Sequence, residues 1–595
     1  MPQGSPLAAL LFHAATNQFV ASMDHALVRA VAVRAAGNPL PVPFTGATPL
    51  TTMATQLIDD ITVHADDVQL VQGPLDQLVT DFAHIGLTLK HSKCSVAARG
   101  AALARARASP LMLRDTDGHT AAVRVVDLDA TTVEVMGVPI GEPGGVLESL
   151  ERLLAKACAD ADMLLTRWHT QLAWAAVRLC VSTRFNHLLR ARDFPGAASA
   201  LARYDDLMAE TLLASVSVEA PYPPHVRRLL EARIGAGGMG MRSQADVAGH
   251  ARAAALVAHA TRGAPGLRGL VLEAIAVGLP PVAGPAARLR VLDITFAPGP
   301  MGAVEARRQG RRIVAGGLQH RLTREAEVAI DPATLPPDVA VVFRQRDAAR
   351  CDALSQPPTP YTLVDNVAWT VQVAATVGAN LMRHIEAVVG SSCPSCRAPM
   401  QPNHWCTCKL ATSEITGRHN AVARVSAAYC GSGGNGALVR LEHVVPHPSG
   451  APGHTQRPDV SITGFAVNGR LTNVHADVLV VDLFSRMANR SAQFGLALQQ
   501  AEGRKRRERD PAARAQGARF VPLVATSHGH LGGEVYDLLR LMRGDRTDAE
   551  VKWWQRALVA AVWRGTGRVV AKYLARLGPL LPSHGATVPD IPAEA

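Results

Sequence analysis

The sequence has no run of about 18 apolar residues, the length that spans a bilayer as a helix. Its first residues, Met1 to Gly4, lack a cationic segment followed by an apolar one, so a secretory signal peptide is not expected. These two absences argue against a membrane-spanning and against a secreted protein. We therefore expect an intracellular protein.

Charge is also sparse. Charged residues make up 19% of the chain and hydrophobic residues 48%, which is too little charge for a wholly disordered protein and enough apolar material for folded cores. At roughly 100 to 200 residues per domain, a chain of 595 residues is expected to form about three to five folded units.

Lysine is rare among the basic residues, with seven lysines in a total of 61 Lys and Arg. Basic residues outnumber the 50 acidic ones, and the net charge of +11 favours polyanionic partners such as nucleic acid or acidic membrane surfaces. The planar guanidinium of arginine suits phosphate. A GC-rich genome produces the same excess of Arg, Ala, Gly and Pro, so the composition leaves the partner open.

The nine cysteines are an odd number and are thinly spread, which argues against a disulfide framework. The exception is Cys393-x2-Cys396-x7-His404-x3-Cys408, whose residue types and spacing suit tetrahedral zinc. Cys406 is an alternative fourth ligand, although one residue between it and His404 makes a more strained chelate. Because four protein ligands leave no position for water, such a zinc ion is expected to be structural.

The apolar pattern divides the chain into regions. Short apolar runs and turns up to about residue 142 predict an α+β region, and helical spacing follows from 145 to 260. Residues 261–300 are rich in Pro and Gly and are typical of a linker. Residues 390–535 alternate strand-like and helical segments, and residues 536–580 have the spacing of amphipathic helices.

Two adjacent acids, Asp59 and Asp60, lie within an apolar stretch that predicts the apex of a hairpin. Carboxylates are the hard ligands that Mg²⁺ prefers, and paired carboxylates serve two-metal phosphoryl transfer. An exposed turn is the simpler interpretation of this pair alone, because Asp-Asp is common in turns.

The order of motifs around this pair resembles the palm of reverse transcriptases from non-LTR retrotransposons. The resemblance assigns metal binding to Asp59 and Asp60 and places Gly137 and Gly141 in a hairpin that holds the primer. It also places four residues beside the template and the incoming nucleotide: Gln3, Gly4, Pro6 and Lys93. In that family a further catalytic aspartate precedes the element that contains Gln3. We therefore expect an N-terminally truncated protein that has lost RNA-directed DNA polymerase activity.

The segment GAGGMG at 235–240 formally matches the G-x-G-x-x-G fingerprint of dinucleotide-binding folds. That fingerprint must follow a strand, whereas this segment follows the basic, helical RRLLEARI. A dehydrogenase-like enzyme is therefore the weakest interpretation of the chain.

Three residues in the C-terminal part have the chemistry of metal-dependent phosphodiester hydrolysis. Asp459 precedes a strand, Asp477 begins the apolar run of the next strand, and Lys505 follows in a charged helical segment. Two carboxylates can hold Mg²⁺, and the lysine can orient a water or stabilise charge on the phosphate. Glu502 is a candidate helper acid, and Asp482 is an alternative second acid. Taken alone, the charged segment favours a solvated helix face.

With the cysteine cluster and Arg418-His419-Asn420, this order resembles the restriction-like endonuclease of site-specific non-LTR retrotransposons, which has a PD-(D/E)xK fold. The resemblance assigns Asp459 and Asp477 to metal binding, Lys505 to catalysis, and Arg418, His419 and Arg457 to the DNA path. Arg509 stands where relatives often carry tyrosine.

Together these resemblances predict a multidomain α+β protein encoded by a retroelement. Its predicted partners are target DNA and the element RNA, its cofactors are structural Zn²⁺ and catalytic Mg²⁺, and its expected location is nuclear if it acts on genomic DNA. A zinc-containing nucleic-acid-binding protein with decayed catalytic centres is the alternative. The predicted domains are a partial palm (1–142), a helical thumb (143–260), a linker and helical region (261–385), a zinc knuckle (386–412), the α/β endonuclease (413–545), and C-terminal helices with a tail (546–595).

Overall fold

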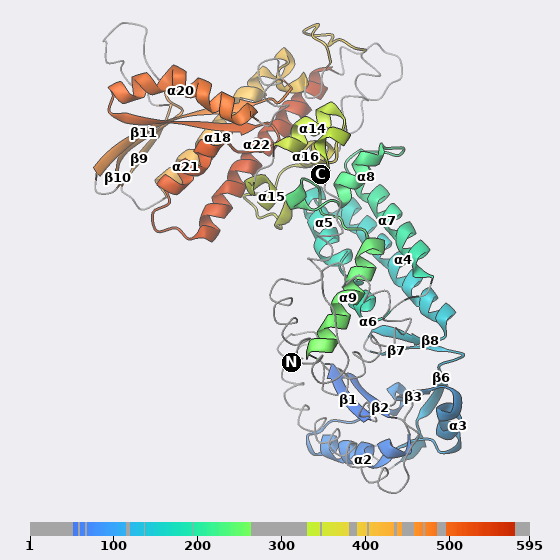
Figure 1. Ribbon diagram of the computed structural model, residues 1–595. Coiled ribbons are helices and arrows are strands. Elements are labelled where there is room, and N and C mark those ends of the chain that lie inside the picture. Colours follow the sequence, from blue (N-terminus) through green and yellow to red (C-terminus); the bar gives the residue numbers. More distant parts are fainter. Residues whose placement is uncertain are drawn as a thin grey trace. The chain divides into compact units, whose positions relative to one another are not determined.

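The computed structural model is a mixed α+β protein, mostly helical with small sheets (Figure 1). It divides into two compact units: residues 1–156, 184–204 and 244–326 form unit 1, and residues 157–183, 205–243 and 327–595 form unit 2. Among the described residues, no helix is long and apolar enough to cross a membrane. The structure describes residues 52–57, 60–65, 68–114, 119–135, 137–192, 194, 196–262, 330–345, 348–379, 390–400, 404–432, 437–442, 457–467, 470–484 and 496–577.

Unit 1 begins with an antiparallel hairpin of β1 (Thr52–Leu57) and β2 (Asp60–Ala65), closed by the pair Leu57 and Asp60. Helix α2 (Gln69–His84) packs Leu78 and Phe82 into a small apolar core with Leu113. The elements that follow are η1 (His91–Lys93), β3 (Ser95–Ala98), α3 (Gly100–Ala108), β4 (Met112–Arg114), β5 (Thr120–Ala122), β6 (Arg124–Asp127), β7 (Thr132–Val135) and β8 (Val138–Gly141).

The β7–β8 hairpin contains the two glycines that the palm resemblance assigns to primer binding. Both have positive φ, and a Cβ on Gly141 would lie 2.1 Å from the carbonyl oxygen of Thr131. The backbone therefore requires glycine at this position whatever the hairpin binds.

Helices dominate residues 143–262, as the apolar spacing predicts. Helix α8 follows the cis peptide bond between Ala220 and Pro221 and starts at a proline, which suits the first helical turn. The elements are α4 (Pro143–Arg167), α5 (Thr170–Ala176), η2 (Val177–Val181), α6 (Asn186–Ala191), α7 (Ala197–Ala214), α8 (Pro224–Glu231), η3 (Ile234–Ala236) and α9 (Gln244–Arg262).

The glycine-rich segment folds back along the C-terminal end of α8, and no strand precedes it. The backbone N–H groups of Met239 and Gly240 donate to the carbonyls of Leu229 and Ala232, at 2.9 and 2.8 Å. A Cβ on Gly238 would lie 2.2 Å from the carbonyl oxygen of Ala232. The glycines therefore permit close packing on a helix, and the context of a dinucleotide fingerprint is missing here.

We expect Gly238→Ala to lower the free energy of unfolding of unit 2 by about 2 kcal/mol, because the new methyl group meets backbone that cannot move aside. Gly235→Ala is the matched control, since a Cβ there has nothing within 4 Å. It should change stability by less than about 0.5 kcal/mol. Urea denaturation of both variants measures the difference, and equal midpoints would contradict this packing role.

Residues 330–379 are the described part of the predicted linker and helical region (261–385), and they form helices that belong to the core of unit 2. It contains η4 (Pro332–Thr334), α14 (Pro337–Arg344), α15 (Ala348–Ser355) and α16 (Asn366–Val377). Nine of the twelve residues of α16 are buried. The Pro- and Gly-rich stretch predicted as a linker, 261–300, lies outside the described residues apart from the end of α9. Asp365 caps α16 by accepting from Ala368 N at 2.7 Å, and Gly378 ends it with positive φ.

The C-terminal part of unit 2 is built on a four-stranded sheet in the order β12-β11-β10-β9. Strands β9, β10 and β11 are antiparallel neighbours, and β11 and β12 are parallel, joined through α20. In Figure 1, α20 lies on one side of this sheet, and α18 and α21 lie on the other. The elements are η5 (His404–Cys406), η6 (Lys409–Ala411), α18 (Thr412–Gly431), β9 (Leu438–Leu441), β10 (Val460–Val467), β11 (Arg470–Val481), α20 (Ala497–Ala515), β12 (Ala518–Thr526), α21 (Gly533–Leu541) and α22 (Asp548–Leu577).

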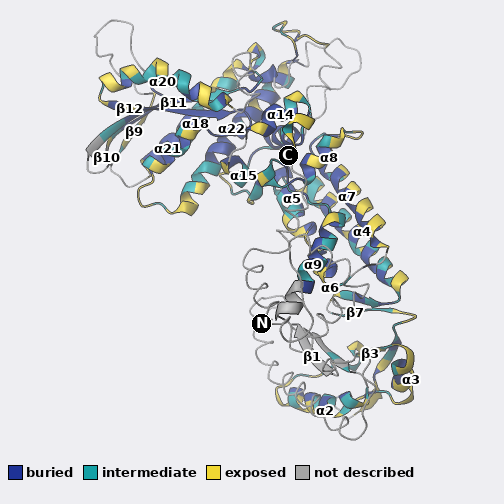
Figure 2. Cartoon of the chain, in the orientation of Figure 1, coloured by how far each residue is buried: buried dark blue, intermediate teal, exposed yellow. Residues whose placement is uncertain are grey.

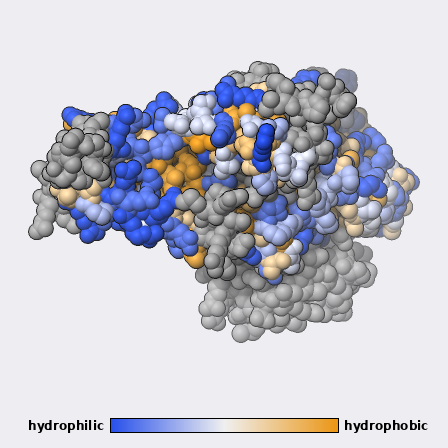
Figure 3. Space-filling model, turned by 90° about the horizontal axis from the view of Figure 1, so that it is seen from above, coloured by the Kyte–Doolittle hydropathy of each residue, from blue (hydrophilic) through white to orange (hydrophobic). Residues whose placement is uncertain are grey.

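Helix α22 is central to unit 2 rather than peripheral. It packs against α15, α16 and α18, and its side chains Trp563 and Tyr573 are among the largest that are fully buried. Figure 2 shows buried residues concentrated in α22 and in β11 and β12. The part of the molecular face seen in Figure 3 that is described is mostly hydrophilic, with apolar patches between.

Candidate metal centre and active site

Three cysteines and one histidine converge in a buried cluster. The ligand atoms of Cys393, Cys396, His404 and Cys408 all lie within 4.8 Å of one another. The Sγ atom of Cys408 lies 3.8 Å from that of Cys393 and 4.0 Å from that of Cys396, and His404 Nε2 lies 3.3 Å from Cys396 Sγ. A zinc ion with Zn–S bonds near 2.3 Å in tetrahedral geometry requires sulfur atoms about 3.8 Å apart. The cluster therefore has the ligands and spacing to hold a metal such as zinc.

The local backbone prepares the first ligand for a metal. Cys393 N donates to the carbonyl of Ala398, and Arg397 N donates to the carbonyl of Cys393, which closes a tight turn with Arg397 at φ 58°. Burial acts to raise the pKa of the Cys393 thiol, but the N–H groups of Cys396 and Ser395 outweigh it, so this pKa is lowered. Burial lowers the pKa of His404 and so favours the neutral imidazole that binds metals.

Cys406 lies apart from this cluster, so Cys408 rather than Cys406 is the fourth candidate ligand. The Sγ atom of Cys406 is 3.6 Å from Nη1 of Arg418, and burial raises the pKa of the Cys406 thiol to about 11. In the 3₁₀ turn of η5, His404 and Cys406 point in different directions, because successive residues are rotated by roughly 120°.

The cluster also contacts α22. The ring of His404 meets the ring of Tyr573 edge-on at 5.9 Å, and the Tyr573 hydroxyl lies 3.9 Å from Cys393 Sγ. The three cysteines share a core with Val569 and Leu577 of the same helix. A metal ion there would stabilise the attachment of the cysteine segment to the core of unit 2.

The second candidate site lies where β10 begins beside β11. Val460, the first residue of β10, pairs with Ala476 in this antiparallel register. Asp459, which comes just before the strand, therefore stands opposite Asp477. The Oδ2 atom of Asp459 accepts from the backbone N–H of Val478 at 2.6 Å and lies 3.1 Å from Nε2 of His419 on α18. The register therefore holds two carboxylates next to each other.

Lys505 reaches this pair from α20. Its Nζ lies 2.7 Å from Asp477 Oδ2, and Arg509 Nε, one turn further along, lies 3.7 Å from the same oxygen. The Lys505 and Asp477 side chains are 16% and 10% exposed, so their charges are mostly shielded from water. The structure thus brings Asp459, Asp477 and Lys505 together from three different elements.

The pKa values of the two carboxyl groups are shifted in opposite directions. Burial acts to raise the pKa of Asp459, but hydrogen bonding to His419 and to Asp477 outweighs it and the pKa is lowered. Burial raises the pKa of Asp477, and the neighbouring Asp459 carboxylate adds to this against the effect of Lys505. Adjacent carboxylates resist ionising together, and a bound cation relieves that repulsion.

The other nuclease candidates occupy different environments. Burial raises the pKa of Glu502, and its Oε1 accepts from the backbone N–H of Glu534 at 3.0 Å, so it caps the start of α21. Asp482 follows the end of β11 and accepts from Phe484 N at 3.4 Å. Asp477 is accordingly the acid beside Asp459.

Three basic candidates for the DNA path are also separated. His419 contacts Asp459, and the hydrogen bond to this carboxylate is the main cause that raises the pKa of the imidazole. Arg457 is 60% exposed and pairs with Glu442 at 2.6 Å. Arg418 is only 2% exposed, and its Nη1 lies 3.3 Å from Thr566 Oγ1 of α22. The structure therefore corrects the assignment of Arg418 to the DNA path, because a buried guanidinium cannot reach a phosphate in this conformation.

The palm candidates are less fully described. Gln3, Gly4, Pro6 and Asp59 lie outside the described residues. Asp60 is the first residue of β2, and Lys93 ends η1 with an exposed side chain.

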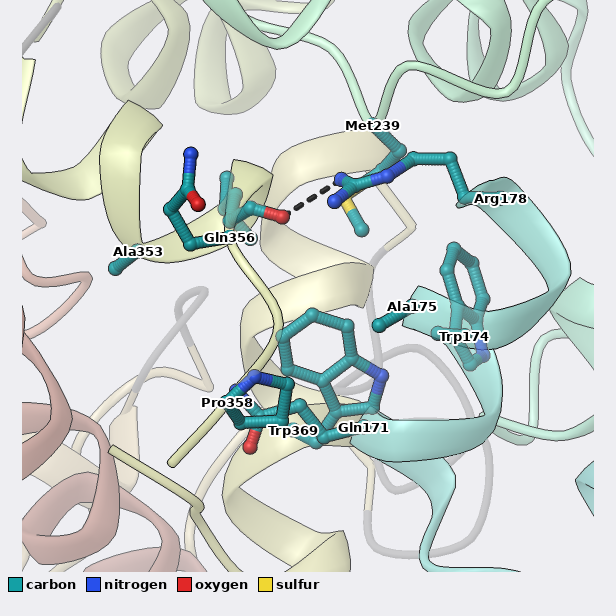
Figure 4. Close-up of a pocket in the computed structure, with 10 residues that line it drawn as sticks. Gln171, Trp174, Ala175, Arg178, Met239, Ala353, Gln356, Pro358 and Trp369 are labelled. Atoms are coloured by element: carbon teal, nitrogen blue, oxygen red, sulfur yellow. Dashed lines mark hydrogen bonds between the residues drawn. The ribbon is translucent and has the colours of Figure 1, made fainter. Parts of the chain in front are cut away.

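A separate small cavity in unit 2 lies between Trp174, Trp369 and Arg178 (Figure 4). The guanidinium of Arg178 donates to the carbonyl of Leu354 at 2.6 Å and to that of Ser355 at 2.5 Å. The volume of this cavity, about 10 Å³, admits about one water molecule, so the cavity is too small for a substrate.

No protein-family model matches this chain, and no curated protein matches it significantly. The resemblance to non-LTR retrotransposon proteins therefore stays a prediction, and the argument for function depends on the geometry of the residues.

Proposed function

We propose that unit 2 is a Mg²⁺-dependent endonuclease that nicks DNA. The observation that carries this proposal is the convergence of Asp459, just before β10, with Asp477 inside β11 and Lys505 in the middle of α20. Two acids on neighbouring strands and a lysine on the following helix agree with the order in the PD-(D/E)xK nucleases that the sequence resembles.

The residues present fit a divalent cation, because the two carboxylates are adjacent and the pKa of one is raised partly by the other. Asp459 and Asp477 would hold Mg²⁺, which when bound polarises the phosphate and lowers the pKa of a water ligand. Lys505 would orient the attacking water and stabilise negative charge on the phosphate as a compact ammonium. Val478 N and His419 fix the Asp459 carboxylate.

The Cys393, Cys396, His404 and Cys408 cluster supports this site as a structural Zn²⁺ centre in our proposal. All four positions of a tetrahedral ion would be filled by protein, so its role is to stabilise the fold. Target DNA and an element RNA as partners, and a nuclear location, follow from the retroelement resemblance and form part of the same proposal.

The test is relaxation of supercoiled plasmid by the full chain with Mg²⁺, compared with the same reaction in EDTA. The proposal expects nicked circles with Mg²⁺ only. Plasmid that stays supercoiled at every Mg²⁺ concentration contradicts the enzyme assignment.

A zinc-stabilised nucleic-acid-binding protein is the second candidate, because Lys505 and Arg509 already offset the charge of Asp477. Such a protein should bind plasmid equally with Mg²⁺ or EDTA and never cut it. The same gels distinguish the two candidates.

A further inference from the structure

After its first turn, which contains Asp548 and Glu550, helix α22 carries basic residues and no acidic ones. Residues 551–577 contain six Lys or Arg and no Asp or Glu. Arg564, Arg568 and Lys572 follow one another at intervals of four and therefore share a face over about 12 Å. We call these three residues the α22 basic row.

The rest of unit 2 leaves much of this charge unpaired. Arg556 pairs with Asp352 at 3.4 Å, and Arg576 donates to the carbonyl of Leu410 at 2.8 Å. Within the described part of the chain, by contrast, neither Arg568 nor Lys572 makes an ion pair or a side-chain hydrogen bond. Like charges four residues apart destabilise a helix, so an anion on this face would remove a repulsion that the protein itself leaves in place.

The electrostatics of Arg564 agree with this interpretation. Burial lowers the pKa of its guanidinium, the neighbouring charge of Arg568 adds to this, and Asp365 opposes it. The carboxylate of Asp365 is occupied as the cap of α16. Between the basic residues, Ala571 and Ala575 are exposed and small, so a phosphate backbone can approach the helix closely.

An exposed tyrosine contacts the first residue of the row through its backbone, and its ring lies nearer the start of α22. Tyr361 is 66% exposed, and its carbonyl accepts from Nη2 of Arg564 at 3.1 Å. Its ring meets that of Trp553 edge-on at 5.4 Å, and Trp553 in turn packs on Trp554 at 4.9 Å. Trp553 thus packs against the Tyr361 ring, which otherwise stays largely exposed to solvent. An unpaired base can stack on an exposed ring of this kind.

We propose that Tyr361 and the α22 basic row bind single-stranded DNA, with phosphates along Arg564, Arg568 and Lys572 and a base on the Tyr361 ring. The aromatic platform favours a single strand over a duplex, whose bases are already stacked. The choice of DNA rests on the proposed endonuclease, because a nick creates a DNA end that can fray from the duplex as a single strand. The surface itself is independent of Asp459, Asp477 and Lys505.

The test is fluorescence anisotropy of the full chain with labelled oligo(dT) of about 20 nucleotides in EDTA, where no nicking occurs. The variant Arg568→Glu/Lys572→Glu removes two phosphate contacts and should bind about 25-fold more weakly near 0.1 M salt, with a salt slope smaller by about 1.4. The milder Arg568→Gln/Lys572→Gln should weaken binding in the same direction. Tyr361→Ala should weaken it without changing the salt slope.

The matched control is Arg514→Glu/Arg540→Glu, which makes the same charge change at side chains that are 76% and 77% exposed. It should bind within about threefold of wild type, because distant surface charges are screened. If the row variants bind like this control, or if a duplex of equal length binds as tightly as oligo(dT), the surface is not a single-strand site. Preference for oligo(U) would overturn the choice of DNA.

The plasmid assay separates this inference from the proposed function. Nicking by wild type together with unchanged oligo(dT) binding by the row variants overturns the α22 surface alone. Loss of binding in the row variants of a protein that never nicks supports the surface and removes the endonuclease.

Discussion

Asp459→Asn is expected to reduce plasmid nicking by about 10³-fold or more, because an amide supplies neither the charge nor the ligand strength that holds Mg²⁺. Asn preserves the shape of the side chain, and its amide oxygen can still accept from Val478 N, so the strand register should survive. Asp477→Asn should have a similar effect and also leaves Lys505 without its carboxylate partner. Initial rates of supercoil loss at saturating Mg²⁺ measure both.

Asp482→Asn is the matched control for these variants. Asp482 is a buried acid at the end of the same strand, and its contact with Phe484 N needs only a carbonyl-type oxygen. Its nicking rate should stay within about tenfold of wild type. Equal loss of nicking in the Asp482 and Asp477 variants would mean that the effect is structural or that Asp482 is the second acid.

The nicking rate of Lys505→Met should fall by about 10²-fold or more, while the folding of the protein stays unchanged.

Removal of the metal from the cysteine cluster is expected to destabilise unit 2 strongly. Cys408→Ser should abolish zinc binding and lower the free energy of unfolding by about 5 kcal/mol, since the binding energy of a structural metal is folding energy. For a unit of more than 300 residues that corresponds to a fall in the melting temperature of roughly 5 to 10 °C. Zinc content by elemental analysis and thermal denaturation measure the two effects.

Cys406→Ser is the control for the zinc variant. Cys406 is buried, as Cys408 is, but contacts Arg418, so the serine variant should keep about one zinc per chain. Loss of zinc from both variants would restore Cys406 as a possible ligand. An unchanged melting temperature in metal-free protein would contradict a structural role.

The cysteine cluster could be predicted from the sequence because its geometry is local. Cys393 and Cys408 are 15 residues apart, so the chain between them is short enough for the spacing of ligand types to restrict the site. The spacing also favoured Cys408 over Cys406 as the fourth ligand, and the structure agrees.

The acid pair could be predicted only in part. The sequence proposed Asp459 with either Asp477 or Asp482, and nothing local distinguishes the two. The antiparallel register shows which of the two lies beside Asp459, because a pairing of Val460 with Ala476 brings Asp477 next to it. The register depends on which strand faces fit the core of unit 2.

Arg418 and His419 illustrate a limit of motif reasoning. They are adjacent in the sequence and were assigned the same role, yet successive helical residues point about 100° apart. One therefore packs against Gly565 and Thr566 of α22, and the other reaches Asp459. A motif fixes the order of residues but not the directions of their side chains.

The sequence by itself determined the mixed α+β class, the metal ligand set and the candidate acids, because composition, periodicity and short spacing are properties of the chain alone. Only the tertiary structure decided that α22 is a core helix and that residues 330–379 pack inside unit 2. Periodicity shows that a helix has an apolar face, whereas what covers that face depends on residues more than 100 positions away.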